Sequence, residues 1–146
     1  MQPEIHLNWG AIAIAVVANF IFGWLWYGPV LGKAWAKEMK MDMTQKPPAK
    51  VMVRGMILMI IGTFLMVFCL KHNMEVWRPS TWKVGTDQPN HLIGFQAGFF
   101  TWLGFFVPQL LGGVAWESKS WKLTGINAAY QFLSLQMVGM ILAFWR

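Results

Sequence analysis

The chain has 146 residues, of which 56% are hydrophobic, 16% aromatic and only 12% charged, and its formal net charge is +6. This length allows one domain, and so few charged residues cannot cover a soluble globule with a polar surface. Lipid is therefore expected to be the solvent for most of the surface. The basic excess then points to membrane lipids, through their headgroups, and not to nucleic acid.

Four apolar runs follow one another along the chain, and each is long enough to cross a hydrocarbon core of ~30 Å as an α-helix. They cover about residues 7–27, 53–70, 92–115 and 123–145. None shows the alternation of a barrel strand, and a backbone in lipid must satisfy its hydrogen bonds internally. The sequence therefore predicts an all-α protein, a four-transmembrane-helix bundle that forms one transmembrane domain over residues 1–146.

The basic residues are distributed unevenly between the two ends of this bundle. Eight lie in or beside the first and third loops: Lys33, Lys37, Lys40, Lys46, Lys50, Arg54, Lys119 and Lys122. Four lie at the other end: Lys71, Arg78, Lys83 and Arg146. The positive-inside rule predicts that both termini lie outside the cell membrane. We expect a multi-pass protein of a bacterial inner membrane.

No Asp, Glu or Lys lies in the middle of an apolar run, and each acid is expected in a loop or a flank. Proton-coupled antiporters need a carboxylate at membrane depth, so this class of transporter is disfavoured. The chain also lacks a Gly-rich phosphate loop, a GxSxG and an HExxH. We expect no enzyme activity and no cofactor.

Uncharged polar residues do occur inside the runs. In the fourth run Asn127, Gln131 and Ser134 recur at i, i+4 and i+7 and form one stripe. The first run adds Asn19, and the third adds Gln96 and Gln109. One interpretation is that these side chains link the helices by hydrogen bonds of ~1 kcal/mol each. The other is that they line a polar cavity for a small ligand or a lipid headgroup.

Three histidines, His6, His72 and His91, are predicted at the same end of three different helices. Imidazoles at one depth could bind copper, zinc or haem iron. However, no two of them have i, i+4 spacing, and histidine is common at the membrane interface. We therefore expect no bound metal, and a metal- or haem-binding component is the third hypothesis for function.

Two stretches carry a resemblance to a known family. The first reads Trp24-Leu25-Trp26-Tyr27-Gly28-Pro29-Val30-Leu31-Gly32-Lys33-Ala34-Trp35, and the second combines Trp121-Lys122-Leu123 with Ile126-Asn127-Ala128-Ala129-Tyr130-Gln131. They resemble the signatures of an uncharacterised family of small, mostly bacterial, four-helix membrane proteins, known only as a domain of unknown function. The resemblance covers nearly the whole chain. It implies the fold and the membrane location, and it implies no activity.

The order of residues around Pro29 recurs around Pro108 in the third run, where Phe105-Phe106 precede the proline and Gly112-Gly113 and Trp116 follow it. We interpret this as two parallel copies of a helix hairpin. Each proline should end or kink its helix, because it lacks an N–H group.

The leading hypothesis for function is a non-catalytic accessory or scaffold subunit of a membrane complex, or a homo-oligomer. It is based on the absence of chemistry-bearing motifs and on small residues such as Gly94 and Gly98, whose GxxxG spacing permits close helix packing. The alternative is a small oligomeric transporter, or a binder of a lipid or hydrophobic ligand, that uses the polar stripe of the fourth helix.

Overall fold

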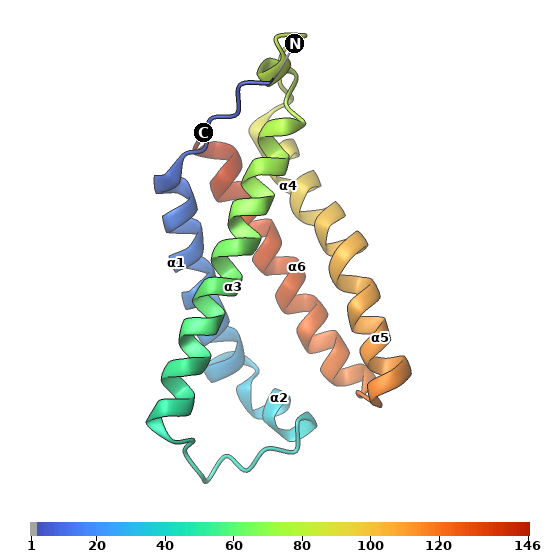
Figure 1. Cartoon of the computed structure of the whole chain (residues 1–146). Helices are drawn as coiled ribbons and strands as arrows, with labels where there is room; N and C mark the ends of the chain where they lie inside the picture. Colours follow the sequence, from blue (N-terminus) through green and yellow to red (C-terminus); the bar gives the residue numbers. More distant parts are fainter. Residues whose placement is uncertain (1–2) are drawn as a thin grey trace.

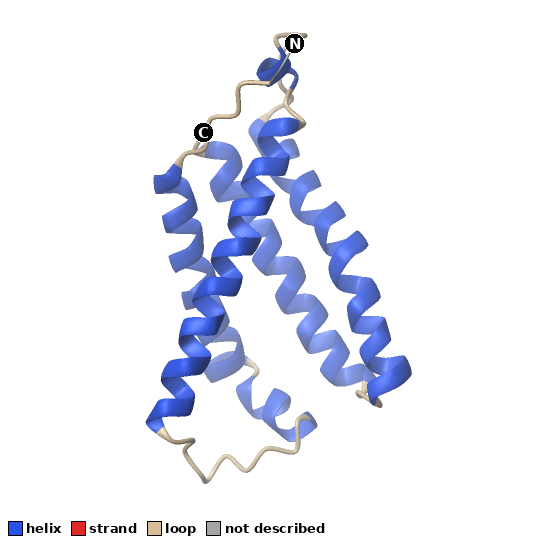
Figure 2. Cartoon of the chain, in the orientation of Figure 1, coloured by secondary structure: helices blue, strands red, loops and turns tan. Residues whose placement is uncertain are grey.

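The computed structural model describes residues 3–146, and this part of the chain consists of helices joined by loops (Figures 1 and 2). Its elements are α1 (Trp9–Leu25), the π-helical turn η1 (Trp26–Val30), α2 (Gly32–Glu38), α3 (Ala49–Val76), the 3-10 turn η2 (Pro79–Trp82), α4 (Asn90–Thr101), the π-helical turn η3 (Trp102–Phe106), α5 (Val107–Glu117) and α6 (Trp121–Phe144). Four spans are long and apolar enough to cross a membrane: Trp9–Val30, Ala49–Val76, Asn90–Glu117 and Trp121–Phe144. The predicted all-α fold class is confirmed.

Polar side chains set where two of these helices begin. The side chain of Asn8 accepts a hydrogen bond from the N–H of Ala11 and caps α1, and Ser120 accepts one from Leu123 and caps α6. Such caps satisfy N–H groups that have no partner within the helix. Both termini lie at one end of the bundle (Figure 1), which we call the terminal end. The opposite end carries α2 and the turn between α5 and α6, and we call it the basic end.

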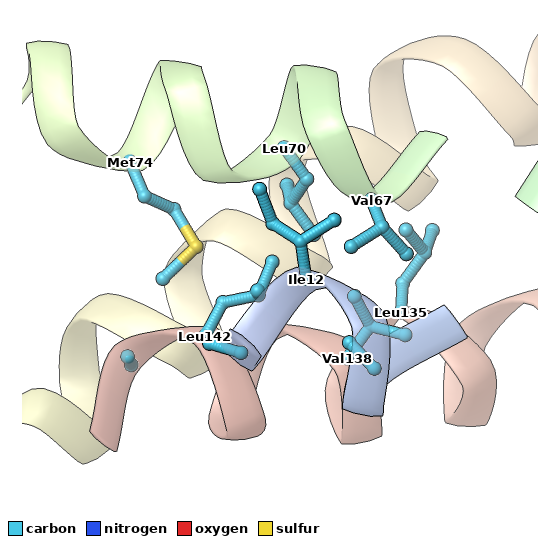
Figure 3. Packing of buried hydrophobic residues seen from close by; sticks show 10 residues of the cluster. Ile12, Val67, Leu70, Met74, Leu135, Val138 and Leu142 are labelled. Atoms are coloured by element: carbon cyan, nitrogen blue, oxygen red, sulfur yellow. The ribbon is translucent and has the colours of Figure 1, made fainter. Parts of the chain in front are cut away.

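Helix α6 lies at the centre of the fold, where it contacts α1, α3, α4 and α5. The buried core joins α6 to α1 and α3 in the half nearer the terminal end. Figure 3 shows its larger members, which are Ile12, Val67, Leu70, Met74, Leu135, Val138 and Leu142. These side chains come from three helices, so the core fixes α1 and α3 against the central helix.

Glycines bring α4 into direct contact with α6. A Cβ atom built on Gly94 would lie 2.9 Å from the backbone oxygen of Gly139, and one built on Gly98 would lie 2.8 Å from the oxygen of Leu135. No side chain fits at these distances. The predicted close approach at Gly94 and Gly98 thus occurs within the bundle, between α4 and α6.

Each proline-containing span is interrupted by a π-helical turn. Pro29 lies inside η1, and Pro108 lies just after η3. Proline removes one hydrogen bond of the helix and clashes with the preceding turn, and a wider turn relieves that clash. The predicted disturbance at both prolines therefore takes the same form, but the first span ends at Val30 whereas the third continues as α5 to Glu117.

Helix α3 diverges from the bundle as it approaches the basic end (Figure 1). Every residue from 49 to 62 is exposed, whereas Thr63, Val67 and Leu70 further along are buried. The exposed half is apolar, so lipid can solvate it. Since α3 and α6 separate here, the part of the core that α3 contributes lies in the other half of the molecule.

Candidate functional site

Two of the predicted site residues meet in the interior. Asn19 of α1 accepts a hydrogen bond from the hydroxyl of Ser134 on α6, and its amide lies 3.5 Å from the hydroxyl of Thr63 on α3. All three residues are buried. Because an unpaired amide is costly in an apolar medium, this chain of hydrogen bonds holds three helices at one level.

A third predicted site residue, Asn127, has a different hydrogen-bond partner. The carbonyl oxygen of Asn127 accepts a hydrogen bond of 2.9 Å from the hydroxyl of Tyr27, whose ring packs against Tyr130 and Trp35. Gln131, the third member of the stripe, is half-buried and forms no side-chain hydrogen bond within residues 3–146. The stripe thus acts mainly as a link between helices.

A small cavity of about 220 Å³ borders this interior chain. Asn19, Thr63, Tyr27 and Tyr130 line it together with apolar residues of α1 and α3. Its volume lies below the ~300–1,000 Å³ that is typical of ligand pockets. Since Asn19, Thr63 and Tyr27 are already hydrogen-bonded to protein side chains, we do not place a ligand here.

The remaining predicted ligand residues lie away from the stripe. Gln109 is exposed on α5 and forms no side-chain hydrogen bond within residues 3–146. Gln96 is exposed on α4 and faces a groove between α3 and α4. Neither amide is hydrogen-bonded to the stripe within residues 3–146, and the glycines of α4 pack its other face against α6.

The groove between α3 and α4 has a volume of about 640 Å³ and opens to the outside of the bundle. Its apolar lining comes from Leu70, Ile93, Ala97, Phe100 and Phe105, among others. Its neutral polar lining consists of Asn73, Gln88, Gln96 and Thr101. Within the described part of the chain these four polar side chains form no hydrogen bond to protein, in contrast to Asn19, Asn127 and Ser134. Apolar walls with a few converging polar groups are typical of ligand sites.

The π-helical turn η3 shapes the end of this groove that contains Phe105. Phe100 and Phe105 are five residues apart and would point in different directions on an uninterrupted α-helix, which has 3.6 residues per turn. The turn at Trp102–Phe106 closes with i→i+5 geometry, as shown by the N–H of Val107 bonded to the oxygen of Trp102. A turn that uses an extra residue brings both rings to the groove.

The other end of the groove abuts a buried cluster of charges. Lys71 lies 2.8 Å from Glu75, and the same carboxylate lies 3.5 Å from Arg78 and 3.2 Å from Arg146. Lys71, Glu75 and Arg78 are at most 3% exposed. The second helix extends beyond the predicted end of its apolar run at residue 70, because Lys71 and Glu75 are helical and α3 continues to Val76.

This cluster also closes the carboxyl end of α6. Lys71 donates to the backbone oxygen of Leu142, and Arg78 donates to that of Ala143, each at 3.2 Å. Backbone oxygens at a helix end have no partner within the helix, and positive charge there is favoured by the helix dipole. Lys71 of α3 and Arg78, two residues after its end, therefore hold the carboxyl end of α6 at the terminal end of the bundle.

Asp87 completes the cluster from the loop that precedes α4. Partial burial favours its protonated form, but hydrogen bonds from the N–H and hydroxyl of Ser80, together with Arg78, outweigh that effect. The pKa of Asp87 consequently lies below its ordinary value. Arg146 lies 3.2 Å from the same carboxylate.

The three histidines are exposed side chains at the terminal end, and His72 stacks on Phe68. Among residues 3–146 no group of three or more His, Cys, Asp or Glu side chains lies close enough to hold a metal ion. The structure thus does not bring His6, His72 and His91 into one metal-binding group.

The groove and its charged end are the features that the sequence analysis missed. One signal was present for the charges: Lys71, Glu75 and Arg78 follow the i, i+4, i+7 spacing of one helix face. The groove had no local signal, because it depends on how far α3 stands from α4. Gln96 was singled out as polar, but its neighbours in space were not predictable.

Four apolar helices, a central α6 and buried charges at one end define a multi-pass α-helical membrane protein. The chain belongs to the family described as protein of unknown function (DUF1761), whose family model matches residues 10–143. This confirms the resemblance to a four-helix family without an assigned activity. No curated protein and no solved structure matches the chain.

Proposed function

We propose that this protein binds a membrane amphiphile in the groove between α3 and α4, without performing a reaction on it. The single observation that supports this most strongly is the groove itself, which has a volume of about 640 Å³, apolar walls and four polar side chains that form no hydrogen bond within residues 3–146. An amphiphile would enter sideways from the bilayer, since the groove opens between two lipid-facing helices.

The cost of unpartnered polar groups in hydrocarbon supports this proposal. Gln96 is exposed on a membrane-spanning helix, and its side chain forms no hydrogen bond to any residue of the described chain. A polar group without a hydrogen-bond partner in lipid costs several kcal/mol. A bound molecule with its own polar groups would remove that cost, whereas the hydrocarbon chains of lipids would not.

A second function is favoured by a different surface. Every residue of α3 from 49 to 62 is exposed, and Gly55 and Gly62 have open space where a Cβ would stand. Small residues let another helix approach closely. This surface suits an accessory subunit of a membrane complex, or a homo-oligomer, and such assembly is compatible with a ligand in the groove.

The orientation in the membrane belongs to the same proposal. The eight basic residues of the basic end would face the cytoplasm, so that the terminal end and the opening of the groove nearest to Arg78 would lie on the outer side of a bacterial inner membrane. A reporter active only in the cytoplasm, fused after Arg146, should stay inactive. Activity of that fusion would reverse the orientation.

The amphiphile itself can be detected by mass spectrometry of molecules that co-purify with the protein in mild detergent. The wild-type protein should retain one amphiphile in stoichiometric amount. Gln96→Trp places a large ring in the groove, and this variant should lose most of the bound amphiphile. Gln109→Trp places the same ring on α5, outside the groove, and this variant should retain the amphiphile. Equal retention by both variants would contradict the proposal.

A further inference from the structure

The two walls of the groove repeat one arrangement of side chains. Four lining residues of the first wall, on α3 and at its end, are Leu70, Asn73, Met74 and Trp77, and four of the second wall, on α4, are Ile93, Gln96, Ala97 and Phe100. Each set follows the i, i+3, i+4, i+7 spacing of one helix face. A molecule in the groove therefore meets a mostly apolar surface on both sides, with one amide on each.

The chemistry of the groove changes with depth. Arg78 donates a hydrogen bond to Asn90, where α4 begins, so its guanidinium marks the terminal end of the groove. Gln96 lies ~9 Å further along α4 at ~1.5 Å per residue, and Phe100 and Phe105 lie deeper still. A charge, an amide and then apolar rings follow the same order as the phosphate, the ester carbonyls and the acyl chains of a glycerophospholipid in a bilayer.

The side-chain charges at the terminal end of the groove do not cancel. Lys71, Glu75 and Arg78 are buried together and comprise two cations and one carboxylate. Arg146 and Asp87, which contact this group, add one charge of each sign. The cluster therefore carries one positive charge in excess. Because a buried charge without a counter-ion is unfavourable, an anion from outside the chain would be attracted to it.

Arg78 connects this excess charge to the groove, since it belongs to the cluster and also lines the groove. One of its terminal nitrogens donates to Asp87 and the other to the backbone oxygen of Ala143. Its Nε lies 3.5 Å from Glu75 and forms no hydrogen bond within the described residues. Arginine pairs well with phosphate, and basic pockets between transmembrane helices bind anionic lipid headgroups.

We propose that the groove binds an anionic glycerophospholipid, with its phosphate at the terminal end beside Arg78. The amides of Asn73 and Gln88 donate hydrogen bonds to the phosphate. Gln96 donates to an ester carbonyl, and the acyl chains follow Phe100 toward the middle of the bilayer. A fatty acid has no oxygen below its carboxylate for Gln96 to bond, and a zwitterionic headgroup brings a second cation to a site that already has one in excess. This inference rests on the proposed function.

The test measures lipid retention by native mass spectrometry of the full chain in mild detergent, with dioleoylphosphatidylglycerol and dioleoylphosphatidylcholine as probes. Wild type should retain phosphatidylglycerol at least about tenfold more strongly than phosphatidylcholine. The double variant Asn73→Leu/Gln96→Leu removes two donors at similar side-chain volume, so its binding of phosphatidylglycerol should weaken by at least about tenfold. Gln109→Leu, the matched control on α5, should bind as wild type does.

A second pair of variants tests the excess charge. Lys71→Met removes one buried cation of the cluster without changing a residue that lines the groove, and the preference for phosphatidylglycerol should fall to near parity. Lys83→Met removes one cation from an exposed ion pair and should keep the preference. The two variants have the same net charge, and thermal unfolding checks that both are folded. A preference that persists in Lys71→Met would contradict the role of the cluster.

The other outcomes separate the inference from the proposed function. Equal retention of both lipids by wild type, or equal retention of phosphatidylglycerol by wild type and the double variant, would overturn the inference. Displacement of the lipid by inorganic phosphate would also overturn it, because it would indicate a site for a free ion. In each case the proposed function stands if an amphiphile co-purifies with wild type and not with Gln96→Trp. If wild type retains no amphiphile, both fail.

Discussion

Trp26 and Trp102 occupy equivalent positions at the start of the two π-helical turns, and both donate their indole N–H to backbone oxygens of α6. Trp26 bonds to Ile126 at 3.3 Å and Trp102 to Ala128 at 3.0 Å. The recurrence around Pro29 and Pro108 thus extends from sequence to hydrogen bonding. The two turns therefore hydrogen-bond to the central helix α6 at residues that are two positions apart in the sequence.

Loss of either indole bond should destabilise the bundle by a similar amount. Trp26→Phe and Trp102→Phe each keep an aromatic ring and remove one N–H donor, and each should lower the free energy of unfolding by about 1 kcal/mol. Thermal unfolding in detergent measures this. Trp24→Phe is the control, since Trp24 is exposed and forms no such bond within residues 3–146. A loss for Trp24→Phe as large as for the other two would contradict this account.

Substitutions at the two ends of the buried ion pair between Glu75 and Lys71 should destabilise the protein by different amounts. Glu75 faces Lys71, Arg78 and Arg146, so Glu75→Gln leaves three cations without their shared carboxylate and should cost about 3–5 kcal/mol. Lys71→Met should cost less, because the carboxylate keeps both arginines.

The exposed ion pair of Lys83 with Glu4 provides the control for this comparison. Its removal by Lys83→Ala should change stability by less than about 1 kcal/mol. Denaturation in mixed micelles would rank the three variants. The account fails if Lys71→Met proves the most damaging.

Asp87 should make stability depend on acid pH. Its pKa is lower in the folded protein than in the unfolded chain, so its contribution is fully present above the unfolded pKa of ~3.9 and is lost as pH falls through the folded pKa. The groups that face it are Arg78, Arg146 and Ser80. The midpoint temperature of thermal unfolding should therefore decrease in wild type as the pH falls below about 4. Asp87→Asn should show a smaller decrease. An identical decrease would mean that a group other than Asp87 causes the pH dependence.

The contact between α4 and α6 should not tolerate a side chain at Gly94. Gly94→Ala places a Cβ 2.9 Å from a backbone oxygen that cannot move freely, so a cost of about 1–3 kcal/mol is expected. Gly55→Ala meets open space and should be neutral or stabilising by up to ~1 kcal/mol through helix propensity. Thermal unfolding compares the two. Equal tolerance would mean that the helices are further apart than described.

The sequence was sufficient for features that depend on local properties. Hydropathy located the four spans, because the length of an apolar run is fixed by bilayer thickness. The polarity of Asn19 and Ser134 indicated a contact between helices, because amides and hydroxyls in lipid need partners. The ends of α3 were predicted less well, since Lys71 interrupts the apolar run while its pairing with Glu75 keeps the helix intact.

The groove could not be predicted, for a physical reason. Its walls depend on the tilt of α3 relative to α4, which follows from the core around Val67 and Leu70 and from the glycine contact between α4 and α6. The position of Phe105 depends in addition on η3, whose extra residue changes which side chains share a face. Periodicity analysis assumes an uninterrupted helix and therefore assigns Phe105 to another face.

Photolabelling in native-like membranes tests the central claim, that an amphiphile occupies the groove, most directly. A lipid analogue with a diazirine on its chain would be activated by light, and the labelled peptides would be mapped by mass spectrometry. The account predicts saturable labelling of peptides that contain Trp77, Phe100 or Phe105, and its loss in Gln96→Trp but not in Gln109→Trp. Labelling of these peptides that rises without saturation, and is unchanged by Gln96→Trp, would contradict it.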